Sequence, residues 1–314
     1  MTGYLLRRLL QSVVVLIGVT IITFILLHQF PGGPARASLG PRATPQQLAH
    51  FNQQYGLNQP LPVQYATWVD QLIHGNLGFS YKLNQSVASI IATYLPKTML
   101  LVGISIALAL VVAVLLGMLQ AVRRNSAIDY FLTGLSFLFY SMPTFWLGIL
   151  LIEILAVKAG VFPAEAPQGS FSQVLSQPAG LILPVITYSL VTVAAFSRYM
   201  RSAALDNLTQ DYVRTARAKG VSELRILFRH VLRNSLIPVV TLLGLYLPLL
   251  FSGALVTESV FNYPGMGYMF WQAALTQDYP VLLGIIMVVG VATVAGSLLA
   301  DILYAVLDPR VRYT

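Results

Sequence analysis

Six long apolar runs divide the chain, and polar segments of unequal length separate them. The runs contain few or no charged residues, and each is long enough to cross a hydrocarbon core of about 30 Å. They cover residues 9–29, 98–122, 130–157, 179–197, 236–257 and 280–303. Because only helices satisfy all backbone groups within such segments, the pattern predicts an all-α, polytopic membrane protein with six transmembrane helices.

The longest polar segment between runs, within residues 30–97, follows the first run and is rich in Gly, Pro, Gln and Asn. Inside it, apolar positions over residues 61–75 recur at helical spacing. This predicts a short amphipathic helix that lies on the membrane surface or caps the bundle. The chain then divides into a first span with its outer segment (1–97), a five-helix core (98–305) that includes a cytoplasmic loop at 198–235, and a cytoplasmic tail (306–314).

Composition agrees with the prediction of a membrane protein, and the distribution of charge predicts which side of the spans faces the cytoplasm. Hydrophobic residues make up 56% of the chain, charged residues only 10%, and the mean hydropathy is +0.72, as is typical of membrane proteins. The chain has no Cys, which excludes disulfides and Cys-based metal sites. Fourteen of the nineteen Lys and Arg residues fall on one side of the six spans. By the positive-inside rule, that side and both termini are expected in the cytoplasm.

One inner segment, DYVRTARAKGVSELRILFRHVLRN over residues 211–234, is unusually basic for this chain. In a first helix, Val213, Ala216 and Gly220 share one face, where small side chains would let another protein's backbone approach closely. Gly220 is expected to stop that helix, and Ser222 is a candidate N-cap for a second one. The segment is therefore predicted to form a helical hairpin.

The second helix of the hairpin is predicted to be amphipathic. Its apolar stripe, facing the membrane or the bundle, is expected to contain Leu224, Leu227, Phe228 and Val231. Its outward basic ridge is expected to contain Arg225, Arg229 and Arg233. Three interpretations compete for the hairpin. Binding to nucleic acid is disfavoured because stacking aromatic residues are missing. Binding of residues 223–234 to anionic lipid is reasonable. Docking to a cytoplasmic partner best explains the Ala/Gly face.

The chain shows no catalytic or metal-binding pattern. Its four His residues are scattered, and no Ser–His–Asp arrangement or phosphate-binding loop motif is present, so any ATP-driven work must be powered by another subunit. Ionisable residues in the runs are Glu153, Glu258 and Asp301. Such residues normally face a bundle interior, and Glu153 and Glu258 are candidates for a solute path as much as for structural pairing. They leave open the alternative of a stand-alone, ion-coupled secondary transporter.

Several stretches, in order along nearly the whole chain, resemble the permease subunits of ABC importers for dipeptides, oligopeptides and nickel. The segment QDYVRTARAKGVSELRILFRHVLRNSLIPVV is similar to their cytoplasmic EAA-type loop. The outer stretch YGLNQPLPVQYATWVDQLIHGNLGFS resembles the first, B-type member of the paired permeases. Further matches are SMPTFWLGILL and ESVFNYPGMGYMFWQAALTQDYP.

The resemblance implies two sets of contact residues. The EAA-type loop would carry a coupling helix that inserts into a groove on an ATPase subunit. Its coupling residues would be Asp211, Arg214, Ala216, Arg217, Ala218 and Gly220. The outer segments would meet a solute-binding protein. The residues expected there are Asn262, Tyr263, Pro264, Gly265, Met266 and Gly267, although Pro-Gly chemistry alone also predicts an ordinary turn.

The resemblance also implies function and assembly. The chain is expected to be a multi-pass permease of the bacterial inner membrane that imports dipeptides or oligopeptides and is not itself an enzyme. Its expected partners are a second homologous permease, two cytoplasmic ATPase subunits, an extracytoplasmic solute-binding protein and membrane lipid, without nucleic acid. ATP and magnesium would bind the ATPase subunits, with no cofactor on this chain. Nickel chelates and glutathione-like solutes are handled by similar chains, so the solute stays open.

Overall fold

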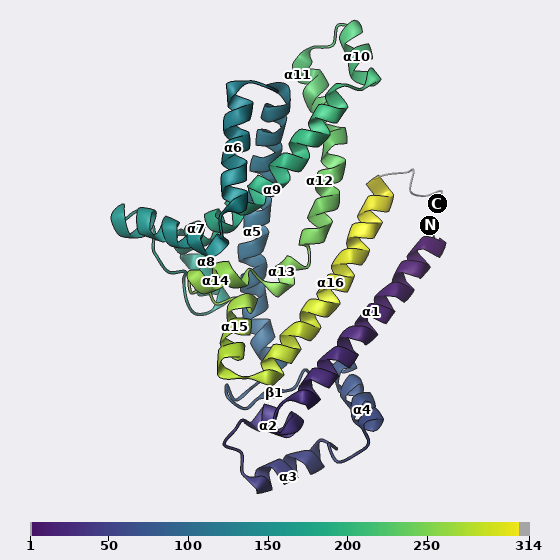
Figure 1. Ribbon diagram of the computed structural model, residues 1–314, viewed down its shortest axis with the longest axis vertical. Coiled ribbons are helices and arrows are strands. Elements are labelled where there is room, and N and C mark those ends of the chain that lie inside the picture. Colours follow the sequence, from purple (N-terminus) through teal and green to yellow (C-terminus); the bar gives the residue numbers. More distant parts are fainter. Residues whose placement is uncertain (1, 308–314) are drawn as a thin grey trace.

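Long apolar helices dominate the computed structural model of the protein, which describes residues 2–307 and the side chains of residues 7–299 (Figure 1). Four of the helices that are long enough to cross a membrane are α1 (Thr2–Gln29), α5 (Val87–Val122), α9 (Ile182–Leu208) and α16 (Tyr279–Leu307). A fifth candidate span runs from Glu223 to Ser252. The prediction of an all-α, polytopic membrane protein is confirmed.

The third apolar run is broken instead of forming one helix. α6 (Ala127–Ser141) is followed by α7 (Thr144–Leu151) and a π-helical turn, η1 (Ile152–Lys158), and the two parts are bent by 105°. Pro143 lies at the break, where its ring disfavours a helical conformation in the preceding residue, and Met142 is extended. The described residues therefore contain five spans, or six if the bent pair is one span.

The fifth candidate span, Glu223–Ser252, is also interrupted. It comprises α11 (Glu223–Ile226), the π-helical turn η3 (Leu227–Val231), α12 (Leu232–Tyr246) and α13 (Leu249–Ser252). Gly253 then takes a left-handed conformation, with φ of 82°, which ends the helix. The chain folds into the short helices α14 (Leu255–Val260) and α15 (Met266–Thr276) before α16 begins. The span predicted at 236–257 therefore ends earlier than expected.

A separate group of short elements, residues 30–86, covers one end of α1 and α16, and we call it the cap (Figure 1). Its elements are α2 (Gly33–Leu39), α3 (Pro45–Gln54), α4 (Leu61–Ile73) and the antiparallel pair β1 (Phe79–Ser80) and β2 (Gln85–Ser86). α4 confirms the predicted amphipathic helix, but the side chain it buries is Gln64, whereas Val63 and Ile73 are exposed.

The boundaries of the predicted regions are displaced in the structure. α5 is continuous across the boundary drawn between residues 97 and 98, because the cap already ends where α5 begins. Residues 198–208 of the predicted loop belong to α9, and only α10 (Asp211–Ala218) with α11 and η3 leaves the bundle. Of the predicted tail at 306–314, residues beyond 307 lie outside the described residues. A further short helix, α8 (Phe171–Ser176), and the 3-10 turn η2 (Pro178–Leu181) precede α9.

The core of the bundle is the contact between α5 and α9, which are in close contact along their lengths. Small residues of α5, Ala109 and Ala113, meet larger residues of α9, Phe196 and Met200. At Gly117 of α5 an added Cβ would lie 2.6 Å from Cβ of Met200. The missing side chain therefore sets how closely the two helices approach.

Replacement of Gly117 by alanine is expected to lower the free energy of unfolding by about 1–3 kcal/mol, because an overpacked contact forces a backbone shift. The matched control is Gly134→Ala in α6, where no atom lies within 4 Å of the added Cβ. Alanine there is expected to be neutral or slightly stabilising, since it favours a helix over glycine. Thermal unfolding of both variants in detergent would measure the difference. Equal unfolding temperatures would contradict the close packing.

Candidate functional site

The α10–α11 hairpin projects from the bundle at the end opposite the cap (Figure 1). Its turn is closed by two backbone hydrogen bonds: the N–H of Val221 donates to the carbonyl of Ala216 (3.1 Å), and that of Gly220 to Arg217 (2.9 Å). Gly220 has a φ of 72°, which a glycine adopts without strain. This is a Schellman end for α10, and it confirms the predicted helix stop. Ser222 stands at the N-cap position of α11, as predicted.

The small-residue face of α10 is turned inward. Val213 and Ala216 are buried and pack with Ile226 and Val231 of the same hairpin. Two alanines of the bundle, from α5 and α9, complete this cluster. The interpretation that Val213 and Ala216 admit the backbone of another protein is therefore wrong, because that close approach is made within the chain itself.

The outward face of α10 is polar and charged. Arg214, Arg217 and Ala218 are exposed, and nothing lies within 4 Å of a Cβ added at Gly220. Arg214 lies 3.4 Å from the carboxylate of Asp211, and Arg217 bridges the turn to Glu223 at 2.7 Å. The hydrogen bonds that Arg217 donates to the carboxylate of Glu223 raise the pKa of Arg217. Of the predicted coupling residues, all except Ala216 are therefore accessible on this face.

In the second part of the hairpin, two members of the predicted stripe do not pack on the bundle. Leu224 is 69% exposed and Phe228 is 66% exposed, so of the two surroundings predicted for the stripe only the membrane is open to them. Val231 is buried as expected, and the other buried anchor is Ile226, which the predicted stripe omits. The predicted basic ridge, of which Arg225 and Arg229 are members, is exposed. The hairpin thus presents two apolar side chains among its arginines.

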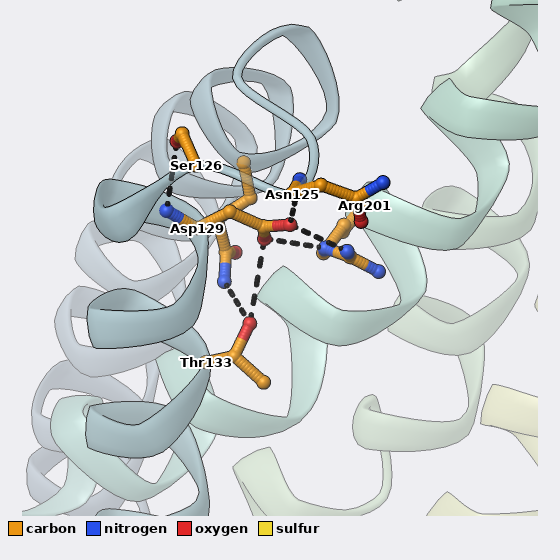
Figure 2. A network of polar contacts seen from close by, with 6 residues as sticks. Asn125, Ser126, Asp129, Thr133 and Arg201 are labelled. Carbon is orange, nitrogen blue, oxygen red and sulfur yellow. Dashed lines mark hydrogen bonds and ion pairs between the residues drawn. The ribbon is translucent and has the colours of Figure 1, made fainter.

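An ion pair between the buried carboxylate of Asp129 and the partly exposed guanidinium group of Arg201 joins α6 to α9 (Figure 2). Asp129, at the start of α6, is 2% exposed. It accepts two hydrogen bonds from the guanidinium group of Arg201 in α9, both at 2.8 Å. Its carboxylate also accepts from the backbone N–H of Asn125 (3.0 Å) and from the hydroxyl of Thr133 (3.4 Å). A bidentate pair with further donors holds a carboxylate in one orientation.

This clamp connects two helices near the hairpin. It joins α6 and the turn before it to α9, and α10 begins ten residues after Arg201, at Asp211. Sequence analysis did not identify Asp129. A local signal was available, since Ser126 precedes it by three residues and caps α6 by accepting a hydrogen bond from its backbone N–H. Its partner Arg201 lies 72 residues further on, which no local pattern reveals.

The carboxylate of Glu258 organises the segment between α13 and α15. Glu258 is fully buried and accepts hydrogen bonds from the hydroxyl of Thr98 in α5 (2.8 Å) and the N–H groups of Ala254 (3.2 Å) and Tyr268 (2.9 Å). A Cβ added at Gly265 would lie 2.5 Å from this carboxylate. Glycine is therefore needed for the backbone to wrap around Glu258.

This arrangement corrects the expectation for residues 262–267. Tyr263 and Met266 are fully buried, Pro264, Gly265 and Gly267 are buried, and only Asn262 is partly exposed. The hydroxyl of Tyr263 donates to the carbonyl of Lys97 at 2.6 Å. The segment therefore packs on α5, and apart from Asn262 it offers a solute-binding protein little surface.

The two candidate path carboxylates lie in different surroundings. Glu153, in η1, is half-exposed, and its carboxylate lies 3.3 Å from the ammonium group of Lys158. Glu258 is enclosed by hydrogen-bond donors, as described above. No interaction between the two carboxylates is observed in the part of the chain described, and each has a structural partner.

The fold and the projecting hairpin define a multi-pass helical membrane protein with a charged, exposed hairpin at one end. Residues 113–313 match the family described as binding-protein-dependent transport system inner membrane component, and residues 1–102 match its N-terminal model. The chain belongs to this family. It is therefore a permease component of the inner membrane, not a catalytic enzyme, and it works with an ATPase and a binding protein.

Curated relatives match this chain over its whole length. The oligopeptide transport system permease protein AppB of Bacillus subtilis is 40% identical over 317 residues, with all of both chains covered. A putative peptide permease protein of Brucella suis is 41% identical over 322 residues, again with full coverage. The dipeptide transport system permease protein DppB of Alkalihalophilus pseudofirmus is 36% identical over 333 residues, with full coverage.

Proposed function

We propose that this chain is the transmembrane subunit of an ATP-driven importer that moves peptides into the cytoplasm. One observation carries the proposal: the α10–α11 hairpin presents a fixed, charged face outside the bundle and is continuous with α9 and, through η3, with α12. A subunit bound to that face would displace both helices together. The relatives named as oligopeptide, peptide and dipeptide permeases support peptides as the solute.

The proposal places the hairpin and both termini in the cytoplasm. The charge distribution supports this orientation, because Arg7 and Arg8 precede the first span and the hairpin holds six further basic residues. The cap then lies on the extracytoplasmic side, where a solute-binding protein would dock. In this orientation the hairpin faces the compartment that contains ATP.

The proposed assembly contains a second homologous permease, two cytoplasmic ATPase subunits and an external solute-binding protein. ATP and magnesium bind the ATPase subunits, and this chain holds no cofactor. Closure of the ATPase pair moves the hairpin, and the two permeases then change from inward-open to outward-open. The coupling residues are Asp211, Arg214, Arg217, Ala218 and Gly220, with Ala216 as a buried support.

Co-purification of the ATPase subunits from native membranes tests this proposal. Arg214→Glu and Ala218→Trp each change the exposed face of α10, and each is expected to weaken ATPase binding about tenfold or more, equivalent to about 1.4 kcal/mol. Ala218 is preferable to Gly220 for the bulky change, because a side chain at a φ of 72° would also strain the turn.

The matched control is Lys82→Glu, the same reversal of charge on an exposed residue of the cap, at the opposite end of the molecule. It should leave ATPase binding unchanged. Peptide uptake into vesicles that contain this chain without any ATPase would overturn the proposal. Equal recovery of ATPase subunits with wild type and both α10 variants would show that the exposed face of α10 does not bind the ATPase.

A further inference from the structure

A cavity of about 250 Å³ lies beneath the cap, between the ends of the two peripheral helices α1 and α16. Phe24 and Leu27 of α1 form one wall, and Leu283 and Met287 of α16 form another. Trp68 of α4 closes the side that faces the cap. The volume is slightly below the range of about 300–1,000 Å³ that is typical of small-molecule pockets. It suits part of an amphipathic molecule.

The lining of the cavity is neutral and changes in character along its length. None of the described lining residues is Asp, Glu, Lys or Arg. The walls from α1 and α16 are apolar except for His28 at the cap end of α1, whereas the cap contributes the amides Gln71 and Asn76 and the hydroxyl of Ser38 beside apolar side chains. An apolar group at the membrane end and an uncharged polar group at the cap end would match this gradient.

Hydrogen bonds between the cap and α1 hold the cavity in shape. The hydroxyl of Thr20 lies 2.7 Å from that of Tyr65 in α4. Gln64, also in α4, lies 2.9 Å from Nε2 of His28 and donates to the carbonyls of Leu57 (2.9 Å) and Gln59 (2.7 Å). The amide of Gln64 is thus fully engaged. The cavity is preformed, so binding requires little ordering of the chain.

The helix that forms one wall is the most exposed of the five unbroken candidate spans in the described residues. Only 11% of the apolar window of α1 is buried, and Ile22 and Leu26 are among its exposed residues. In a membrane, the part of this surface that no other subunit covers contacts lipid tails, and the cavity lies at its end, at the level where α1 passes into the cap. Lipid tails are therefore the apolar groups that the membrane supplies to the cavity.

We propose that the cavity binds one acyl chain of a membrane phospholipid, with the ester region of that lipid at the amides of the cap. The bound chain fills the space between α1, α16 and α4 and supports the cap against the bundle. This site is additional to the proposed transport function and does not depend on it.

Fluorescence of Trp68 measures occupancy of the cavity directly. The chain has three tryptophans, and the exposed Trp146 and Trp271 can be replaced by phenylalanine to leave Trp68 alone. The full chain would be placed in nanodiscs of phosphatidylcholine, with or without bromine near the middle of the acyl chains. Brominated lipid is expected to quench Trp68, and Ser38→Phe and Leu72→Phe, which fill the cavity, are expected to remove most of the quenching.

The matched control is Ile22→Phe, on the exposed surface of α1 and outside the lining, which should leave the quenching unchanged. If brominated lipid does not quench Trp68 in the single-tryptophan protein, the proposal is overturned, and the filling variants are not needed. Equal quenching in both filling variants would place the lipid outside the cavity and would also overturn it. Relief of the quenching by trileucine would assign the cavity to peptide instead of lipid.

Discussion

Glu258→Ala is expected to lower the free energy of unfolding by at least about 3 kcal/mol. The change leaves the hydroxyl of Thr98 and the N–H groups of Ala254 and Tyr268 without the acceptor that they have now. Each buried donor without a partner costs about 1–3 kcal/mol. The segment from α13 to α15 should separate from α5, and thermal unfolding in detergent would detect the loss.

Glu153→Ala is the matched control, because it removes the other candidate path carboxylate. Its ion pair with Lys158 is half-exposed on the carboxylate side and more exposed on the lysine side, so the expected cost is about 0–1 kcal/mol. Equal stability of the two variants would contradict the structural role of Glu258. A Glu258→Ala protein that folds normally but does not take up peptide would indicate that Glu258 is part of the solute path.

Hydropathy predicted the long helices well, because the length of an apolar run is a property of the sequence alone. α1 and α16 fall where the runs predict them, whereas α5 starts earlier, within the cap-side polar segment, and α9 continues past its run to Leu208. Hydropathy does not report where a run breaks. The bend at Pro143 and the helix end at Gly253 depend on backbone conformation, and an apolar composition continues through both.

In the hairpin, some features are determined by residues close in sequence and others by contacts with distant helices. The turn at Gly220 and the N-cap position of Ser222 follow from residues close in sequence, and both were predicted. Which face of α10 is buried depends on alanines of α5 and α9, which are distant along the chain. A face of small residues can pack on a partner protein or on the chain's own bundle, so the sequence alone does not distinguish these two possibilities.

The turn at residues 262–267 was also predicted only in part. Pro264-Gly265 was correctly interpreted as turn chemistry, but the prediction that the turn is exposed to a solute-binding protein was wrong. Gly265 is required because a Cβ added there would lie 2.5 Å from the carboxylate of Glu258, and Gly267 because a Cβ added there would lie 2.6 Å from Cα of Leu255. A glycine that accommodates a buried side chain and a glycine in an exposed loop leave the same signal in a sequence.

Arg201→Ala is expected to lower the free energy of unfolding by about 3–5 kcal/mol, because it leaves the carboxylate of Asp129 buried without a counterion. The clamp joins α6 to α9, and α9 carries the hairpin. Loss of the clamp should therefore also reduce the ATPase activity that the solute-binding protein stimulates. Thermal unfolding and stimulated ATPase activity, both measured on the complete transporter, would show the two effects.

Arg198→Ala is the control on the same helix. Arg198 is exposed and stacks on the rings of Phe137 (5.0 Å) and Tyr140 (5.2 Å), a contact worth about 0.5–1 kcal/mol at an exposed site.

The double variant Asp129→Asn, Arg201→Leu removes both charges, and an asparagine oxygen can still accept from the N–H of Asn125. It should recover part of the stability, since replacing a whole buried pair costs less than breaking it. If it recovers stability but not stimulated ATPase activity, the clamp acts in coupling as well as in folding; if Arg201→Ala is no worse than Arg198→Ala, the clamp has neither role.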